Sequence, residues 1–194
     1  SMLPGARVLV HAETAELAKG VMPAGASSAL LGHSGKHPLG EDLATARAIL
    51  TALATGQPVQ VTHIASALAL ELVRFGKQQA RATGRPGLIS ADATFNHLLL
   101  TEDAIAQYGT QAKINPPLRS WADQEALRTA VADGTLDALT TDHAPHTFDE
   151  KAQELELAPN GAVGLEIIFG LLGGHLVDNV SLAVPTEAVD NGDL

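Results

Sequence analysis

The sequence contains no cysteine, and only 3% of its 194 residues are aromatic. The absence of cysteine excludes disulfides, thiolate nucleophiles and cysteine-bound zinc. Because aromatic side chains are scarce, a core would be built mainly from Leu, Val, Ile and Ala, and 45% of the residues are hydrophobic. Any metal ion would have to be bound by the 8 histidines and the carboxylates.

Basic residues are scarce as well, with 12 Lys and Arg against 22 Asp and Glu and a formal net charge of −10. This balance repels a phosphate backbone, so we expect no nucleic-acid partner. The segment 1–5 has no basic stretch leading into an apolar run, and the apolar stretch 161–177 is interrupted by Glu166 and His175. We therefore expect neither a signal peptide nor a membrane span, and a cytoplasmic location.

Short apolar runs alternate with longer segments of helical period along the chain. The predicted strands are 6–11, 58–63, 87–94 and 136–141, and the predicted helices are 39–55, 67–82, 121–133 and 161–173. Because strands that are apolar throughout are typical of sheets covered by helices, the pattern predicts an α/β fold with a parallel sheet. The remaining expectations are a loop at 23–38, a connection at 95–119 with one short helix capped by Thr101, one domain over 1–177, and a loosely ordered polar tail over 178–194.

Several residues mark where the predicted helices begin and end. Ser66 and Ser120 stand where N-caps are expected, and Gly56 stands where the first long helix ends. In that helix, 39–55, one face carries the apolar residues that we expect to contact the core: Leu43, Ala46, Ile49, Leu50 and Leu53.

Three side chains able to bind a metal ion stand at the ends of predicted strands: His11, His63 and Asp142. The carboxyl ends of parallel strands form the face where α/β proteins bind ligands, so we expect these side chains to converge. Two imidazoles and a carboxylate would form part of a zinc shell. Each residue taken alone is also compatible with a hydrogen-bonded structural role.

Two loop segments carry further polar groups. In 140–146, Asp142 precedes a proline-stiffened turn and His146, and a carboxylate beside a metal ion can take a proton from water and pass it to a leaving nitrogen. The alternative is a polar loop in which Asp142 caps a helix. In 113–119, two consecutive prolines fix the backbone around Asn115, whose amide either contacts a polar ligand or bonds its own backbone.

Six motifs stand out in chain order: Val10-His11-Ala12-Glu13, Thr62-His63-Ile64-Ala65-Ser66, Asn96-His97-Leu98-Leu99-Leu100-Thr101, Lys113-Ile114-Asn115-Pro116-Pro117-Leu118-Arg119, Thr141-Asp142-His143-Ala144-Pro145-His146 and Ala158-Pro159-Asn160-Gly161-Ala162-Val163-Gly164-Leu165-Glu166. In this order they resemble the motifs of dihydroorotase, a cyclic amidohydrolase of the metal-dependent amidohydrolase superfamily. The resemblance runs from about residue 3 to about residue 172. The fourth and fifth motifs are the most specific, since hydantoinases and allantoinases usually differ around the Asp-His pair.

The resemblance implies a role for each matched residue. His11 and His63 look like metal ligands at the ends of the fifth and sixth barrel strands, and Asp142 looks like a metal-contacting carboxylate that is also the catalytic acid and base. The residues that look like substrate contacts are Asn115, His146, Asn160 and Gly161. Asn160 departs from the family, in which Phe commonly precedes that glycine.

The resemblance also indicates what is missing from this sequence. It has no counterpart to the His-x-His pair of the first barrel strand or to the bridging Lys or Asp of the fourth. A complete barrel usually needs about 250 residues, so this chain is short for one. We therefore expect a partial TIM-like (β/α) barrel of about four β/α units, matching strands 5–8, with part of a zinc site that is binuclear in the family.

The activity that the resemblance implies is the zinc-dependent interconversion of dihydroorotate and N-carbamoyl-aspartate in pyrimidine biosynthesis. The open sheet edges of a partial barrel also favour a homo-oligomer. Two alternatives stay open at this point: a non-catalytic dihydroorotase-like partner of aspartate transcarbamoylase, and an allantoinase or hydantoinase.

Overall fold

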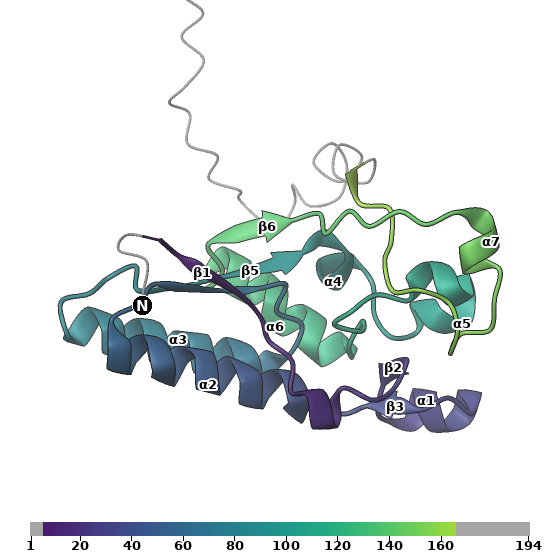
Figure 1. Ribbon diagram of the computed structural model, residues 1–194, viewed down its shortest axis with the longest axis horizontal. Helices are drawn as coiled ribbons and strands as arrows, with labels where there is room; N and C mark the ends of the chain where they lie inside the picture. Colours follow the sequence, from purple (N-terminus) through teal and green to yellow (C-terminus); the bar gives the residue numbers. More distant parts are fainter. Residues whose placement is uncertain (1–5, 166–194) are drawn as a thin grey trace, which may run out of the picture.

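Parallel strands form the main sheet in the computed structural model, which describes residues 6–165 (Figure 1). The strands are β1 (Val8–His11), β4 (Val59–Thr62), β5 (Ile89–Thr94) and β6 (Ala138–Thr140), and they lie in the order β1-β4-β5-β6. All three pairings are parallel. The four predicted strands and the α/β class are therefore confirmed, with the last strand shorter than expected.

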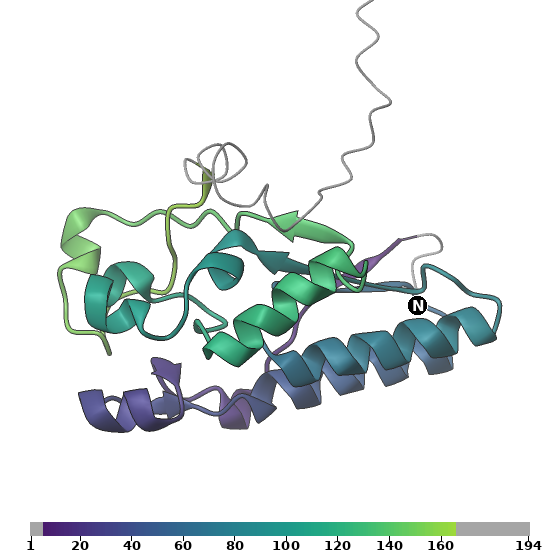
Figure 2. The same ribbon diagram turned by 180° about the vertical axis from the view of Figure 1, so that it is seen from behind.

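Helices connect each strand to its neighbour in the sheet. They are α2 (Leu39–Thr55), α3 (Ala67–Ala82) and α6 (Trp121–Ala132), which match three predicted helices closely. Figures 1 and 2 show all three on the same side of the sheet, with α3 between α2 and α6. Helices on one side of a parallel sheet are the arrangement of a segment of a (β/α) barrel, in which helices form the outer ring.

The predicted caps are present at the helix ends. The Ser66 hydroxyl accepts hydrogen bonds from the backbone N–H groups of Leu68 and Ala69, and the Ser120 hydroxyl accepts one from Asp123. Gly56 ends α2 in the left-handed conformation, with φ of 77°. Local capping chemistry thus sets these boundaries.

The main core lies between the sheet and these helices. At Gly76 of α3, an added Cβ would lie 2.6 Å from Ile49 of α2 and 2.7 Å from Ile89 of β5, so only glycine permits this close approach. The largest fully buried aliphatic residues around this contact are Ile49, Val61, Ile64, Leu70, Val73, Leu98 and Leu127.

The predicted core face of α2 is wrong in part. Ile49 is buried, but Leu43 and Leu50 are 47% and 58% exposed. The buried residues of the helix are instead mostly small or acidic: Gly40, Glu41, Asp42, Ala44, Thr45, Ile49 and Ala52. Small residues on the inner face allow α2 to lie close to α3 and the sheet, which leaves the larger leucines outside.

The two segments predicted as connections contain more structure than expected. The loop at 23–38 includes α1 (Ala26–Leu31), and its ends contribute to a two-stranded parallel sheet of β2 (Met22–Pro23) and β3 (Gly35–Lys36). The connection at 95–119 includes α4 (Phe95–Leu99), α5 (Ala104–Tyr108) and the 3-10 helix η2 (Gly109–Ala112). Asp103, and not Thr101, is the N-cap residue of α5. The other short elements are η1 (Ala15–Leu17) and α7 (Phe148–Lys151).

Part of the sequence prediction lies outside the described residues. This applies to residues 166–173 of the predicted helix 161–173 and to the whole polar tail 178–194. Residues 161–164 are not helical, and Ala162 forms an isolated β-bridge with His143. The domain boundary at 177 therefore stays a prediction. Within residues 6–165, no helix is long and apolar enough to span a lipid bilayer.

Candidate metal and substrate site

Two histidines predicted as metal ligands lie in direct contact at the carboxyl end of the sheet. His11 is the last residue of β1, and the register pairs it with Thr62 at the end of β4. His63 follows Thr62, and its Nε2 lies 2.9 Å from Nδ1 of His11. The ring centroids are 4.6 Å apart with an interplanar angle of 69°. Strand register alone therefore brings together two residues that are 52 positions apart.

Hydrogen-bonding groups surround the histidine pair. The Asn115 amide Nδ2 lies 3.3 Å from Nε2 of His11, and an amide nitrogen can only donate. In the 2.9 Å contact between His11 Nδ1 and His63 Nε2, one nitrogen carries the proton and the other accepts it, so this proton must be lost before both nitrogens can bind one metal ion. The other ring nitrogen of His63, Nδ1, is buried and has no hydrogen-bond partner among the described residues.

The electrostatic surroundings favour a neutral His63. Burial lowers the pKa of His63, repulsion from His11 lowers it further, and Asp142 and Asp92 act in the opposite direction. A neutral imidazole is the form that binds a metal ion, so the lowered pKa favours metal binding near neutral pH.

The geometry of the pair fits two ligands of one zinc ion. Two nitrogens bound to a tetrahedral zinc are about 3.3 Å apart, given Zn–N bonds of about 2.0–2.1 Å. The 2.9 Å between the two ring nitrogens is close to that separation. The unpartnered Nδ1 of His63 also shows that hydrogen bonding within the described residues leaves this ring incompletely satisfied.

Asp142 follows β6 and lies exposed near this pair. Its negative charge opposes the lowering of the His63 pKa. Within residues 6–165, however, no three His, Asp or Glu side chains lie close enough to hold a metal ion. The structure therefore brings His11 and His63 together and leaves Asp142 outside their contact.

His63 and Asp142 share an unusual backbone conformation. Their φ angles are 44° and 45°, and they alone have positive φ among the non-glycine residues between 6 and 165. This region is unfavourable for residues with a Cβ, and such strain concentrates at functional sites. His63 directly follows β4 and Asp142 lies two residues after β6, so both predicted ligands stand where the chain turns after a strand.

Asn115 belongs to a charged network that sequence reasoning missed. Its Oδ1 accepts from the Lys36 ammonium at 2.7 Å, and its Nδ2 donates to Glu13 at 3.2 Å as well as facing His11. Although burial alone raises the pKa of Glu13, hydrogen bonding and attraction from Lys36 hold it below its usual value. Lys36 and Glu13 form an ion pair of 2.5 Å, so this network holds Asn115 beside the histidines.

The other three predicted substrate contacts form a second cluster. The Nε2–H of His146 donates to the carbonyl of Asn160 at 3.0 Å, and the N–H of Gly161 donates to the carbonyl of Lys113 at 2.9 Å. Gly161 has φ of 140°, and an added Cβ would lie 2.5 Å from the Ala144 carbonyl. This position therefore requires glycine, and the bond to Lys113 ties the cluster to the segment that carries Asn115.

Two buried side chains, those of His97 and Arg119, hold the segment that contains Asn115 in place. His97 accepts from the Thr94 hydroxyl at Nδ1 and donates from Nε2 to the Pro116 carbonyl, at 2.7 and 3.0 Å. Complete burial lowers the pKa of His97 to about 4, so this histidine is neutral. Arg119 donates a hydrogen bond to Glu41 at 2.9 Å. The Glu41 carboxylate also accepts hydrogen bonds from the backbone N–H groups of Ala65 and Ser66, directly before α3.

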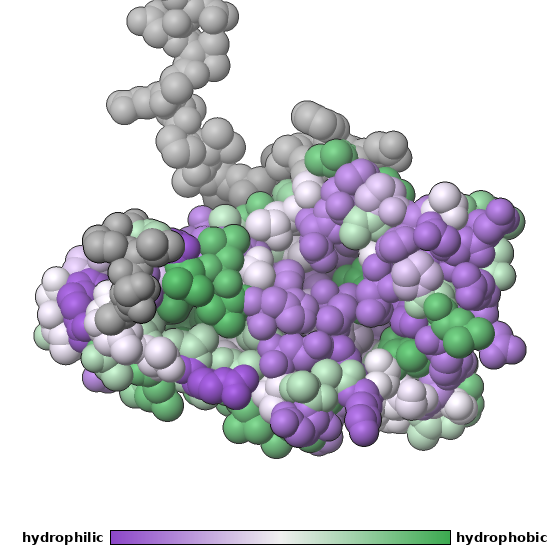
Figure 3. Space-filling model, in the orientation of Figure 1, coloured by the Kyte–Doolittle hydropathy of each residue, from purple (hydrophilic) through white to green (hydrophobic). Residues whose placement is uncertain are grey.

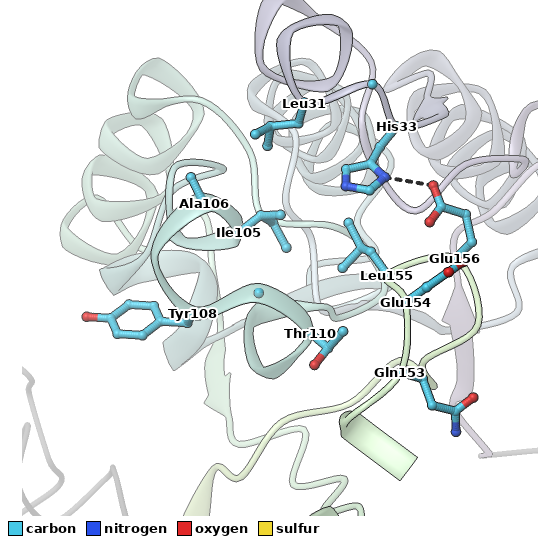
Figure 4. A pocket seen from close by; sticks show the side chains of 12 residues that line it. Leu31, His33, Ile105, Ala106, Tyr108, Thr110, Gln153, Glu154, Leu155 and Glu156 are labelled. Carbon is cyan, nitrogen blue, oxygen red and sulfur yellow. Dashed lines mark hydrogen bonds and ion pairs between the residues drawn. The ribbon is translucent and has the colours of Figure 1, made fainter. Parts of the chain in front are cut away.

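A large cavity lies apart from these residues. It has a volume of about 740 Å³ and is bordered by α1, α5 and the segment 153–156. Figure 4 shows His33 turned toward Glu156 at its rim, where the two side chains are 2.7 Å apart. None of the residues predicted from the sequence as site residues lines this cavity.

On the surface of the molecule, the polar site and the apolar edge of the sheet lie side by side (Figure 3). Figure 3 shows hydrophilic residues in the middle of this face, where the strands end, and an apolar patch beside them in the region of β1. Val8 and Leu9 of β1 are 47% and 66% exposed. The polar groups thus gather at one end of the strands.

Known proteins resemble this chain in sequence and in structure, although no family model matches it. The chain is 41% identical over 186 residues to a dihydroorotase of Pelotomaculum thermopropionicum, covering 95% of this chain and 42% of that protein. It is also 41% identical over 163 residues to a dihydroorotase of Trichlorobacter lovleyi, covering 84% of this chain and 37% of the relative.

Solved structures of hydantoinases share the fold. A D-hydantoinase (dihydropyrimidinase) from Thermus sp. superposes with a TM-score of 0.71, and an L-hydantoinase (dihydropyrimidinase) from Arthrobacter aurescens with 0.75. Both are 25% identical to this chain, and each match covers 92% of this chain and 40% of the other. The predicted partial (β/α) barrel is thereby confirmed. The chain is thus similar in sequence to dihydroorotases over most of its length and similar in structure to hydantoinases, and it spans about two fifths of the length of the relatives it matches.

Proposed function

We propose that this chain is part of a zinc-dependent dihydroorotase, which interconverts dihydroorotate and N-carbamoyl-aspartate in pyrimidine biosynthesis. The observation that carries the proposal is the contact of His11 and His63 at the strand ends, in a chain about 40% identical to dihydroorotases. A pair of imidazoles at this place is suited to a metal ion.

His11 and His63 would hold the zinc ion, and Asp142 would contact it. When bound, zinc supplies a Lewis acid that polarises the ring amide and makes water more acidic. Asp142 is exposed at the same end of the sheet, where it can take a proton from water and deliver it to the ring nitrogen. In the hydrolytic direction, the oxygen of water bonds to the carbonyl carbon, the C–N bond breaks, and the nitrogen receives that proton.

The remaining site residues would bind the substrate. The Asn115 amide is held by Lys36 and Glu13 and can present a donor and an acceptor to the polar ring. His146 would pair with the substrate carboxylate, beside the backbone of Asn160 and Gly161. In these roles the substrate-binding residues orient the ring and take part in no other step of the reaction.

The site within this chain is incomplete as a zinc shell, because the described residues supply two imidazoles in contact and no group of three ligands. Full activity is therefore expected from a chain that spans the whole length of the relatives. A homo-oligomer, an aspartate transcarbamoylase partner and a cytoplasmic location stay predictions.

A hydantoinase is the second candidate, favoured by the structural matches with TM-scores of 0.71 and 0.75. Both reactions open a cyclic amide, so the fold does not distinguish them. The relatives with higher sequence identity are dihydroorotases, which favours the first candidate.

The test is to assay ring opening of dihydroorotate and of hydantoin, with and without zinc. It uses the 194-residue chain and a longer chain covering the full length of the relatives. We expect zinc-dependent turnover of dihydroorotate by the longer chain. Turnover of hydantoin alone would favour the second candidate, and no turnover of either compound would contradict both.

A further inference from the structure

A completely buried carboxylate lies beneath the histidine pair. Asp92 is in the middle of β5 and has no exposed surface. An isolated buried carboxylate is costly, so its hydrogen bonds must repay the loss of water. Sequence reasoning gave this residue no role, and the proposed mechanism does not use it.

The carboxylate of Asp92 binds donors from both neighbouring strands. From β4 and the turn after it come the Gln60 amide at 2.6 Å, the Thr62 hydroxyl at 3.1 Å and the His63 N–H at 2.7 Å. From β6 comes the Thr140 hydroxyl at 3.2 Å. Asp92 therefore links β5 to the carboxyl ends of β4 and β6, directly before His63 and two residues before Asp142.

Two groups of Asp92 act on the turn at His63. Its side chain accepts the N–H of His63, and its backbone carbonyl accepts the N–H of Ile64 at 2.8 Å. His63 has φ of 44°, a conformation that persists only where the surroundings fix it. Consecutive N–H groups are thus bound by one residue at the point where the backbone turns.

We propose that Asp92 is a positioning residue that holds His63 in this turn, so that its ring meets His11. The role of Asp92 at the His63 turn follows from the hydrogen bonds themselves. The consequence of that role for metal binding rests on the proposed function. Among the described residues, Asp92 forms no hydrogen bond with either ring, and it acts through the backbone of His63 and Ile64.

Replacement by asparagine tests the role of the carboxylate with little change of shape. Oδ1 accepts from Thr62, His63 and Thr140, and Oδ2 accepts from Gln60. An amide has one acceptor oxygen and one donor NH₂ group. In Asp92→Asn the NH₂ group would therefore face at least one other donor, and the turn at His63 would lose part of its support.

The matched control is Asp137→Asn. Asp137 precedes β6, and its carboxylate accepts the N–H of Ala91 at 2.8 Å and pairs with Lys77. It thus also binds a backbone N–H within the sheet, but it has no contact with the turn at His63. A general weakening of the sheet would appear in both variants.

The primary readout needs no metal. Amide hydrogen exchange at His63 and the nuclear Overhauser contact between the His11 and His63 rings are measured by NMR in the 194-residue chain. We expect exchange at His63 to accelerate by at least about tenfold in Asp92→Asn and the ring contact to weaken, with neither change in Asp137→Asn. Unchanged exchange in Asp92→Asn, or an equal change in both variants, would overturn the proposal.

Zinc affinity, measured with zinc alone against a chelating dye, provides the second readout. We expect Asp92→Asn to bind zinc at least about tenfold more weakly than the wild type, and Asp137→Asn to bind as the wild type does. If neither this chain nor a longer chain spanning the full length of the relatives binds zinc, the proposed function fails, whereas amide exchange at His63 still decides the role of Asp92.

A milder variant covers the case in which Asp92→Asn does not fold. Thr62→Val together with Thr140→Val removes two of the donors to Oδ1 and keeps the carboxylate. Since the carboxylate is then less firmly held, exchange at His63 should accelerate while the fold persists. Wild-type exchange in this folded double variant would overturn the proposal.

Discussion

Nδ1 of His11 lies 2.9 Å from Nε2 of His63, and the two residues come from the ends of adjacent parallel strands. Local structure alone does not bring them together, because each stands at the end of a different strand and the two are separated by a complete β/α unit. The parallel register converts two distant sequence positions into one site. Predictions about this site therefore test the fold as well as the chemistry.

Replacement of His63 by alanine should abolish specific zinc binding. The loss should exceed the roughly 100-fold that follows from removing a residue that only supports a ligand. Affinity is measured by competition with a chelating dye in the 194-residue chain.

The control for this prediction is His33→Ala. His33 is also a histidine paired with one partner, Glu156, but it lies at the rim of the separate cavity. Zinc affinity should stay at the wild-type value in this variant. Equal losses in both variants would show that zinc binds to surface histidines in general.

Replacement of Asp142 by asparagine should remove most of the catalytic activity of the longer chain. General acid–base catalysis contributes about 10²–10⁴-fold, so kcat for dihydroorotate should fall by a factor in this range. The control is Asp149→Asn, which alters an exposed acid in the first turn of α7. Retention of kcat in Asp142→Asn, measured at saturating zinc, would contradict the assigned proton transfer.

The buried His97 should make the fold less stable in acid. Its pKa falls from 6.5 to about 4 in the folded chain. Between these values the unfolded chain binds the proton and the folded chain does not, so stability is full above about pH 6.5 and decreases as the pH falls toward 4. The shift corresponds to at most about 3 kcal/mol, because one pKa unit is about 1.4 kcal/mol.

Denaturant unfolding of the wild type and of His97→Gln at several pH values measures this effect. The variant should be less stable at pH 7, because the Thr94 and Pro116 contacts are altered. The difference between the two proteins should shrink as the pH falls, since only the wild type carries the His97 proton-linked loss. A difference that stays constant with pH would show that His97 is not the source of the acid sensitivity.

The parts of the fold that follow from local chemistry were predictable from the sequence. Ser66 and Ser120 cap the helices that follow them, and short apolar runs form the four strands. The orientation of α2 was not predictable by the same means. Its apolar residues occupy more than one face, and periodicity alone cannot show that Leu43 and Leu50 face outward.

The site was predictable only as far as strand ends mark it. His11 and His63 stand at such ends and meet as expected, whereas Lys36 reaches Asn115 across 79 positions from a segment predicted to be a loop. Asp92 carried a usable signal, because an acidic residue within an apolar strand must be either bound by donors or exposed. Which donors bind it depends on the neighbouring strands, which a single sequence does not reveal.

The exposed edge of β1 should cause self-association of the 194-residue chain. Within residues 6–165, β1 pairs with β4 on one side only, and Leu9 on this strand is 66% exposed. An unpaired apolar edge strand is a site for association with another chain. Sedimentation velocity over a range of concentrations should therefore show oligomers of the wild type, and Leu9→Lys should shift the population toward the monomer.

The control for this prediction is Leu30→Lys, which places the same charge at a leucine of α1 that is 87% exposed and lies away from the main sheet. Because α1 contributes no edge to that sheet, this variant should associate as the wild type does. If both variants become monomeric, added charge and not the β1 edge controls association. If Leu9→Lys associates like the wild type, the β1 edge is not the interface.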